Sequence, residues 1–127
     1  MAVSKSTPIL VVDDYRTMIR IVRNLLQQLG FDNVDDASDG ASALAKLREQ
    51  TFGLVISDWM MEPMSGLELL QQIRADPKLR ALRFIMITAD NRKDRVARAE
   101  QAGADGFIVK PFNAEALCDR IAAVMGR

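Results

Sequence analysis

The sequence predicts an α/β fold in which helices cover both faces of one parallel sheet. Two observations support this prediction. Five short strand-like segments alternate with five amphipathic segments along the chain, and four of the strand-like segments are apolar throughout, as expected for strands buried on both faces. With 127 residues, the chain has the size of a single domain covering residues 1–127. We therefore expect a three-layer sandwich of helices, five parallel strands and helices.

The first half of the chain contains two strands and two helices by this pattern. Residues 8–12 form an apolar strand, and residues 15–29 form a long amphipathic helix that Gly30 closes. Residues 33–37 are polar and predict a weak strand at an edge of the sheet. A second helix is expected over residues 41–49. The apolar positions of these two helices are Met18, Ile19, Val22, Leu25, Leu26, Leu29, Ala43, Leu44 and Leu47.

The second half begins with the strand Leu54-Val55-Ile56-Ser57, which ends at Asp58. Two further strands are expected over residues 82–87 and 107–109. Three helices alternate with these strands: residues 66–74 capped by Ser65, residues 91–102 stopped by Gly103, and a last helix capped by Asn113. Their predicted inward-facing residues are Leu67, Leu70, Ile73, Val96, Ala99, Ala102, Leu117, Cys118, Ile121, Ala122 and Met125.

Composition excludes several classes of protein. The chain has no histidine and one cysteine, Cys118, which argues against the common zinc sites, an internal disulfide and histidine chemistry. The formal net charge is zero, so no overall field favours nucleic acid, and we expect no DNA partner. No apolar run approaches the roughly 20 residues of a membrane span. We therefore expect a cytoplasmic protein without a membrane partner.

Polar side chains stand at the ends of four predicted strands: Asp13 and Asp14, Asp58, Thr88, and Lys110. The carboxyl ends of parallel strands meet at one edge of a sheet, where functional groups collect. Each residue has an ordinary explanation when taken alone, such as a helix cap for Asp13 or Asp14. Their combination at four strand ends predicts a shared site.

The residue types of this predicted site favour phosphoryl transfer. Carboxylates that lie close together disfavour one another's charged form, and a divalent cation relieves that repulsion. A site with oxygen ligands and no histidine or cysteine favours Mg²⁺. Asp58 can attack a phosphoryl group, while Lys110 and Thr88 can bind its oxygens. The predicted chemistry is therefore phosphorylation of Asp58.

The set Asp13-Asp14, Asp58, Thr88 and Lys110-Pro111 closely resembles that of the receiver domain of bacterial two-component response regulators. The resemblance covers nearly the whole chain and is greatest to the single-domain regulators of chemotaxis. It lies in the segments Thr17-Met18, Ile21–Leu26, Leu29–Phe31, Val55–Trp59 and Gly66–Leu70. It implies a flavodoxin-like (βα)5 fold with strand order 2-1-3-4-5.

The resemblance also implies a role for each site residue. Asp58 matches the phospho-acceptor, which takes its phosphoryl group from a phosphohistidine of a histidine kinase. Asp14, Asp58 and the backbone carbonyl of Met60 match the Mg²⁺ ligands, and Asp13 matches the acid that acts through a metal-bound water. Lys110 matches the lysine that pairs with the phosphoryl group, and the peptide bond between Lys110 and Pro111 is expected to be cis. Thr88 matches the switch hydroxyl.

Three features near the site depart from the family pattern or vary within it: one loop, one aromatic position and a pair of variable positions. The loop Met61-Glu62-Pro63-Met64-Ser65-Gly66 has its proline one place later than usual and an acid in the usual place. Phe107 stands where chemotaxis regulators have a tyrosine, and we expect its ring to move inward on phosphorylation. Met60 and Asp90 match the variable positions that set how fast the acyl phosphate hydrolyses.

The resemblance implies a signalling phosphoprotein rather than an enzyme, with at most phosphorylation from small donors and self-dephosphorylation. Phosphorylation would change the surface of the fourth helix, fifth strand and fifth helix and so control a downstream protein, the flagellar motor switch if the protein acts in chemotaxis. A phosphorelay intermediate outside chemotaxis is an alternative. A phosphatase of the haloacid dehalogenase type is disfavoured because Asp58-Trp59-Met60 lacks its second acid.

An excess of basic residues marks the segment from Arg74 to Arg98, which contains eight arginines and lysines against three aspartates, a net charge of +5 by that count. A solvated face or a docking surface for an acidic kinase domain is the simpler interpretation. The alternative is an anion site for a cyclic dinucleotide, formed by Arg92, Arg95 and Arg98.

Overall fold

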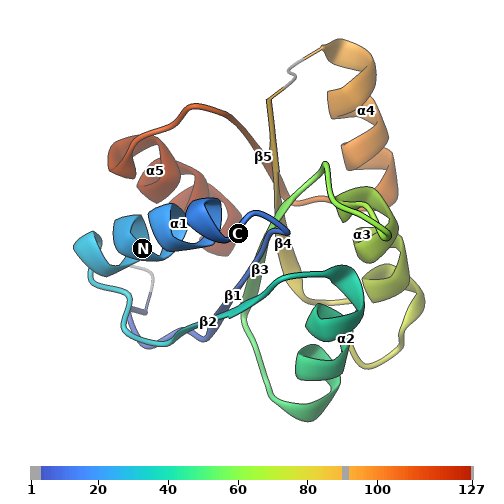
Figure 1. The fold of residues 1–127 in the computed structure, drawn as a ribbon, viewed down its shortest axis with the longest axis horizontal. Helices are drawn as coiled ribbons and strands as arrows, with labels where there is room; N and C mark the ends of the chain where they lie inside the picture. The colour runs from blue at the N-terminus through green and yellow to red at the C-terminus, as the bar shows by residue number, and fades with distance from the viewer. Residues whose placement is uncertain (1–3, 90–91, 127) are drawn as a thin grey trace.

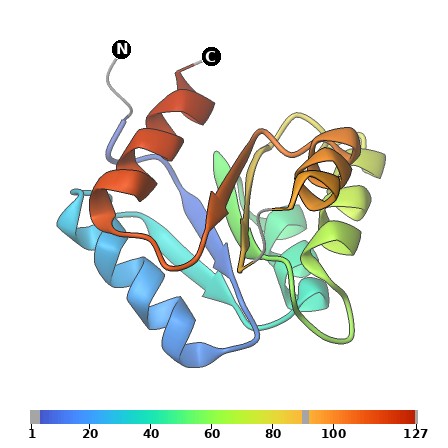
Figure 2. The same cartoon turned by 90° about the horizontal axis from the view of Figure 1, so that it is seen from above.

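The computed structural model describes residues 4–89 and 92–126, and they form a five-stranded parallel sheet flanked by helices (Figures 1 and 2). The strand order is β2-β1-β3-β4-β5, which confirms the order implied by the family resemblance. The strands are β1 (Ile9–Val12), β2 (Val34–Ala37), β3 (Leu54–Asp58), β4 (Arg83–Thr88) and β5 (Gly106–Val109). The helices are α1 (Arg16–Gln28), α2 (Gly40–Glu49), α3 (Gly66–Ala75), α4 (Lys93–Ala102) and α5 (Ala114–Met125).

The sheet separates two hydrophobic cores, because alternate side chains of each strand point to opposite faces. Leu10 and Val12 of β1 belong to the core that is shared with α2, α3 and α4. Ile9 and Val11 of the same strand belong to the core shared with α1 and α5. Figure 1 shows the same division, with α1 and α5 on one side of the sheet and the other three helices on the opposite side.

Helix ends follow the predicted capping residues. Ser65 and Glu68 form a reciprocal capping box at the start of α3, and Asn113 caps α5 by accepting a hydrogen bond from the Ala116 N–H at 2.8 Å. Gly30 and Gly103 adopt positive φ angles of 92° and 103°, as expected where α1 and α4 end.

Several predicted boundaries and inner faces were wrong by one or two residues. Helix α4 begins at Lys93 rather than residue 91, and β4 is Arg83–Thr88 rather than 82–87. In α5, Ala122 is exposed and Val124 is buried instead, because the buried stripe runs through Leu117, Ile121 and Val124. Strand β5, predicted to be buried on both faces, is half-buried because it forms an edge of the sheet.

The β2 edge of the sheet is covered by side chains. Arg23 of α1 donates to the Val34 carbonyl at 3.0 Å and to the Asp36 carboxylate. Lys46 of α2 donates to the Asp36 carbonyl and, at 3.0 Å, to the Asp35 carboxylate. The Asp36 N–H donates to the Asp35 carboxylate at 2.8 Å. Because these backbone groups already have partners, the edge is poorly suited to pairing with another strand.

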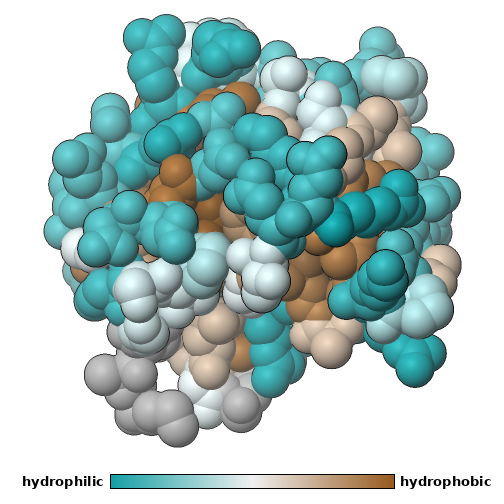
Figure 3. Space-filling model, turned by 90° about the horizontal axis from the view of Figure 1, so that it is seen from below, coloured by the Kyte–Doolittle hydropathy of each residue, from teal (hydrophilic) through white to brown (hydrophobic). Residues whose placement is uncertain are grey.

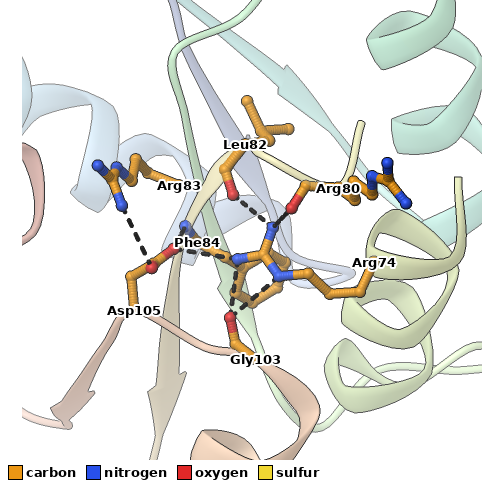
Figure 4. Close-up of polar contacts among 7 residues, drawn as sticks. All are labelled: Arg74, Arg80, Leu82, Arg83, Phe84, Gly103 and Asp105. Carbon is orange, nitrogen blue, oxygen red and sulfur yellow. Dashed lines mark hydrogen bonds and ion pairs between the residues drawn. The ribbon is translucent and has the colours of Figure 1, made fainter. Parts of the chain in front are cut away.

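Arg74 joins α3 to the end of α4 (Figure 4). Its guanidinium donates to the Gly103 carbonyl at 3.1 and 2.7 Å, to the carbonyls of Arg80 and Leu82, and to the Asp105 carboxylate at 3.0 Å. Asp105 also accepts from the Phe84 N–H at 2.9 Å. This network fixes the C-terminal end of α4 against the beginning of β4.

Hydrophobic side chains reach the surface in patches between hydrophilic ones when the molecule is seen from below (Figure 3). One groove of about 470 Å³ has Leu47, Phe52, Leu79 and Leu82 among its lining residues. None of the helices in the described ranges has the length and apolar character needed to cross a bilayer.

Candidate functional site

Three of the predicted site residues lie buried at the carboxyl edge of the sheet. Asp13 follows β1, Asp58 ends β3 and Thr88 ends β4, and their exposed fractions are 3%, 4% and 3%. Buried polar side chains are costly unless they are paired, so three of them on neighbouring strands indicate a built site rather than a solvated surface.

Lys110 completes this group from the end of β5. Its ammonium nitrogen lies 2.7 Å from the Asp58 carboxylate. Its backbone N–H donates to the Thr88 carbonyl at 2.8 Å, which ties the lysine to the end of β4. The Lys110–Pro111 peptide bond is cis, as the family resemblance implied. Residues at four separate strand ends therefore lie at one edge of the sheet, with the Lys110 ammonium directly against the Asp58 carboxylate.

Asp13 has an unusual pKa. Its pKa is raised from 3.8 to about 6, mainly because burial disfavours the charged carboxylate. The Tyr15 N–H, which donates to the carboxylate at 2.9 Å, and the charge of Lys110 lower the pKa, while the charges of Asp58 and Asp14 raise it. Desolvation and two neighbouring carboxylates thus make the negative charge on Asp13 unfavourable. A cation placed among these acids would relieve this cost.

Asp14 and Met60 lie on the exposed side of the site. The Asp14 carboxylate accepts a hydrogen bond from the Glu62 N–H at 3.4 Å, which links the β1 end to the loop after β3. Met60 is 68% exposed. The altered loop contains a second cis peptide bond, Glu62–Pro63, which sequence reasoning did not anticipate.

The oxygen atoms available at this site fit a hard divalent ion whose ligands come partly from the protein and partly from water. Within residues 4–89 and 92–126, no three acidic or cysteine side chains are grouped closely enough to hold a metal by themselves. The candidate ligands are two carboxylates, Asp14 and Asp58, and the Met60 carbonyl, with Asp13 able to act through water. A shell of one or two carboxylates completed largely by solvent oxygens is typical of Mg²⁺.

Gly66 allows the backbone to turn tightly behind Asp58. Its N–H donates to the Trp59 carbonyl at 2.8 Å. A Cβ atom at this position would lie 2.2 Å from the Asp58 carbonyl oxygen and 2.9 Å from the Trp59 Cα. Only glycine fits here without moving the residue that ends β3.

The remaining predicted residues differ in how the structure places them. Phe107 is half-buried, packs against the core shared by α2, α3 and α4, and lines a groove on either side of β5. Arg92 lies with its Nε atom 4.0 Å from the Asp94 carboxylate. Asp90, the second of the variable positions, lies outside the described residues.

Arg95 and Arg98, the other two candidates for an anion site, both lie over the Trp59 ring. The distances from the guanidinium carbon to the ring centroid are 5.2 and 5.8 Å. Sequence reasoning missed Trp59 as a partner of α4. The one sequence signal for a shared partner is that Arg95 and Arg98 are three residues apart, which places them on the same face of the helix.

These features define the receiver class of protein, and the chain belongs to the response regulator receiver domain family, whose model matches residues 9–122. Among its relatives are chemotaxis protein CheY-3 of Vibrio cholerae, 45% identical over 124 residues (98% of this chain and 95% of the relative), and chemotaxis protein CheY of Pseudomonas aeruginosa, 44% identical over 119 residues (94% and 96%).

Solved structures agree with this assignment. The chemotaxis protein CheY4 of Vibrio cholerae, crystallised at low pH, superimposes with a TM-score of 0.88 at 32% identity, covering 94% of this chain and 98% of that one. A CheY-like receiver domain protein from Methanospirillum hungatei gives a TM-score of 0.81 at 31% identity, covering 91% and 90%.

Proposed function

We propose that the protein is a two-component response regulator whose Asp58 accepts a phosphoryl group from a histidine kinase. The observation that carries this proposal is the 2.7 Å pair between Lys110 and Asp58 at a buried edge that also holds Asp13 and Thr88. The lysine holds the carboxylate in place before transfer and is positioned to bind phosphoryl oxygens after it.

In the proposed step, a carboxylate oxygen of Asp58 attacks the phosphorus of a phosphohistidine. The new O–P bond forms as the P–N bond breaks, and the imidazole nitrogen leaves with the electron pair. Lys110 moves its hydrogen bonds from the carboxylate to the phosphoryl oxygens. When bound by Asp14, Asp58 and the Met60 carbonyl, with Asp13 through water, Mg²⁺ would supply positive charge that offsets the charge of the phosphoryl group.

The added charge can drive a switch through Thr88 and Phe107. Phosphorylation adds about −1.5 to −2 charges. A hundredfold shift between two arrangements needs about 2.7 kcal/mol, which two charge-assisted hydrogen bonds from Lys110 and Thr88 can supply at roughly 1.5–3 kcal/mol each. In this proposal Phe107 turns inward and the surface formed by α4, β5 and α5 changes its affinity for a target protein.

The relatives named as chemotaxis proteins support a role in chemotaxis. In that role, the proposed target is the flagellar motor switch. A phosphorelay role outside chemotaxis is the alternative, and pull-down with purified motor-switch protein, with and without phosphorylation, separates the two. In either role the protein acts as a cytoplasmic signalling phosphoprotein, not as a turnover enzyme.

The test of phosphorylation is incubation with acetyl phosphate and Mg²⁺, followed by intact-protein mass spectrometry. We expect one added phosphate, none in Asp58→Ala, and none when EDTA removes the metal. Asp119→Ala, which removes an exposed carboxylate of α5, is the matched control and should be phosphorylated normally. Phosphate retained in Asp58→Ala would contradict the proposed acceptor.

The cyclic dinucleotide alternative gains no support from the arrangement of the arginines. Arg95 and Arg98 are directed at Trp59, and Arg92 lies beside Asp94. Titration calorimetry with a cyclic dinucleotide remains its direct test, and we expect no heat of binding.

A further inference from the structure

Trp59 connects the phosphorylation site to two other elements. It follows Asp58 directly, its N–H donates to the Ile87 carbonyl of β4 at 2.8 Å, and its carbonyl accepts from the Gly66 N–H of α3 at 2.8 Å. Trp59 is only 4% exposed and belongs to the same core as Ala99 of α4. The ring is therefore fixed relative to Asp58 and faces α4.

Long side chains contact helix α4 at two places in addition to its apolar packing. At its C-terminal end, Arg74 donates to the Gly103 carbonyl, where the chain turns with a positive φ angle (Figure 4). In its first two turns, Arg95 and Arg98 lie over the Trp59 ring at 5.2 and 5.8 Å. The apolar contacts of the helix come from Ala99, which is fully buried, and from Ala102, which is partly buried against the same core.

Two guanidinium groups over one indole are an attractive arrangement, because the face of the ring is negative and tryptophan is the strongest of the aromatic partners. The arrangement also places two positive charges beside the residue that follows Asp58. Guanidinium groups bind phosphate oxygens through charge-assisted hydrogen bonds. A phosphoryl group on Asp58 would therefore compete with the ring for these cations.

We propose that Arg95 and Arg98 are positioning residues that couple α4 to the state of Asp58 through the Trp59 ring. In the unmodified protein they hold the first two turns of α4 against the ring, and phosphorylation weakens this attachment while Arg74 keeps the other end in place. The coupling rests on the proposed phosphorylation of Asp58, and it assigns to α4 a route of regulation that does not pass through Thr88 and Phe107.

The test compares wild type with the double variant Arg95→Gln/Arg98→Gln and with Lys93→Gln. Lys93 is an exposed residue of the same helix, so its substitution removes a positive charge of α4 without touching Trp59. Hydrogen exchange of the α4 amides and acrylamide quenching of Trp59, the only tryptophan in the chain, are the two measurements. The single variant Arg98→Gln provides a milder change if the double variant folds poorly.

In unmodified protein, we expect α4 amides to exchange about 5- to 30-fold faster in the double variant than in wild type, with stronger quenching of Trp59 and no such change in Lys93→Gln. Equal exchange in wild type and the arginine variants would overturn the attachment. If α4 exchange rises as much in Lys93→Gln as in the double variant, the role of the ring is overturned, because losing any positive charge of α4 would then be enough to loosen the helix.

The coupling is tested by repeating both measurements with acetyl phosphate and Mg²⁺, with the mass of each sample recorded. We expect phosphorylation to accelerate α4 exchange in wild type and to have little further effect in the double variant. Added phosphate with unchanged α4 exchange in wild type would overturn the coupling alone. No added phosphate in wild type would overturn the proposed function and the coupling with it, and the mass distinguishes these two results.

Discussion

The ammonium group of Lys110 lies 2.7 Å from the carboxylate of Asp58, although the two residues end strands that are separated in the sheet by β4. The Lys110 side chain crosses the end of β4, where its own N–H is bonded to the Thr88 carbonyl. This contact makes the lysine the direct partner of the carboxylate that we propose is phosphorylated. Its removal is therefore the sharpest single-residue test of the site.

Lys110→Met should slow phosphate incorporation from acetyl phosphate by about 10²-fold or more, the usual effect of losing one positioned donor at a site of developing negative charge. Lys110→Arg keeps the charge and should lose less. Lys78→Met, an exposed lysine between α3 and β4, is the matched control. Mass spectrometry over a time course gives the rates, and equal rates for Lys110→Met and wild type would refute the role of Lys110.

Gly66→Ala should destabilise the protein by about 1–3 kcal/mol, because the added methyl group would overlap the Asp58 carbonyl and the backbone of Trp59. A loss of stability would be informative, because replacing glycine by alanine within a helix normally stabilises a protein by roughly 0.5–1 kcal/mol. Urea unfolding provides the measurement. In Gly30→Ala, whose Cβ would come no closer than 3.7 Å to Lys5, only the positive φ angle of 92° opposes the substitution. A smaller loss is expected there.

Asp39, the residue that caps α2, should make the free energy of unfolding depend on pH in the acid range. Hydrogen bonds from the backbone and side chain of Ser42 lower the pKa of Asp39 below 3.8. A lowered pKa in the folded state means that the ionised cap stabilises the protein above the unfolded pKa and that this contribution is lost as the pH falls through the folded pKa.

Asp39→Ala should therefore cost about 1 kcal/mol near pH 7 and less below pH 3.8. Urea unfolding at several pH values measures the difference. A cost that does not change with pH would show that the charge on Asp39 contributes nothing. Asp39→Asn, which keeps an acceptor at the cap, should show a smaller loss.

Removing the cover of the β2 edge should promote self-association. The double variant Arg23→Met/Lys46→Met leaves the carbonyls of Val34 and Asp36 without the donors seen here. We expect its average mass in sedimentation velocity to rise with concentration toward that of a dimer or larger species. Arg20→Met, an exposed arginine of the same helix, should remain monomeric, and a monomeric double variant would show that these side chains are not needed to protect the edge.

Sequence reasoning predicted most of this structure, because its strongest signals are local. The apolar run before Asp58 predicts a strand, and Ser65 and Asn113 predict the helix starts that the structure has. Boundaries were less reliable, as for α4, whose first residue is Lys93. Periodicity identifies an element strongly in its interior and only weakly at its ends, and α4 lacks a capping signal because Arg92, the residue before it, makes no side-chain capping hydrogen bond.

Local sequence patterns predict the alternation of strands and helices. This alternation places Asp13, Asp58, Thr88 and Lys110 at one edge of the sheet, because parallel strands bring their carboxyl ends together. The pairing of side chains that are distant in the sequence is visible only in three dimensions. The contacts of Arg95 and Arg98 with Trp59, and of Arg74 with Gly103 and Asp105, join residues from different elements. No local pattern encodes such contacts, because they depend on where packing of the helices on the sheet places each long side chain.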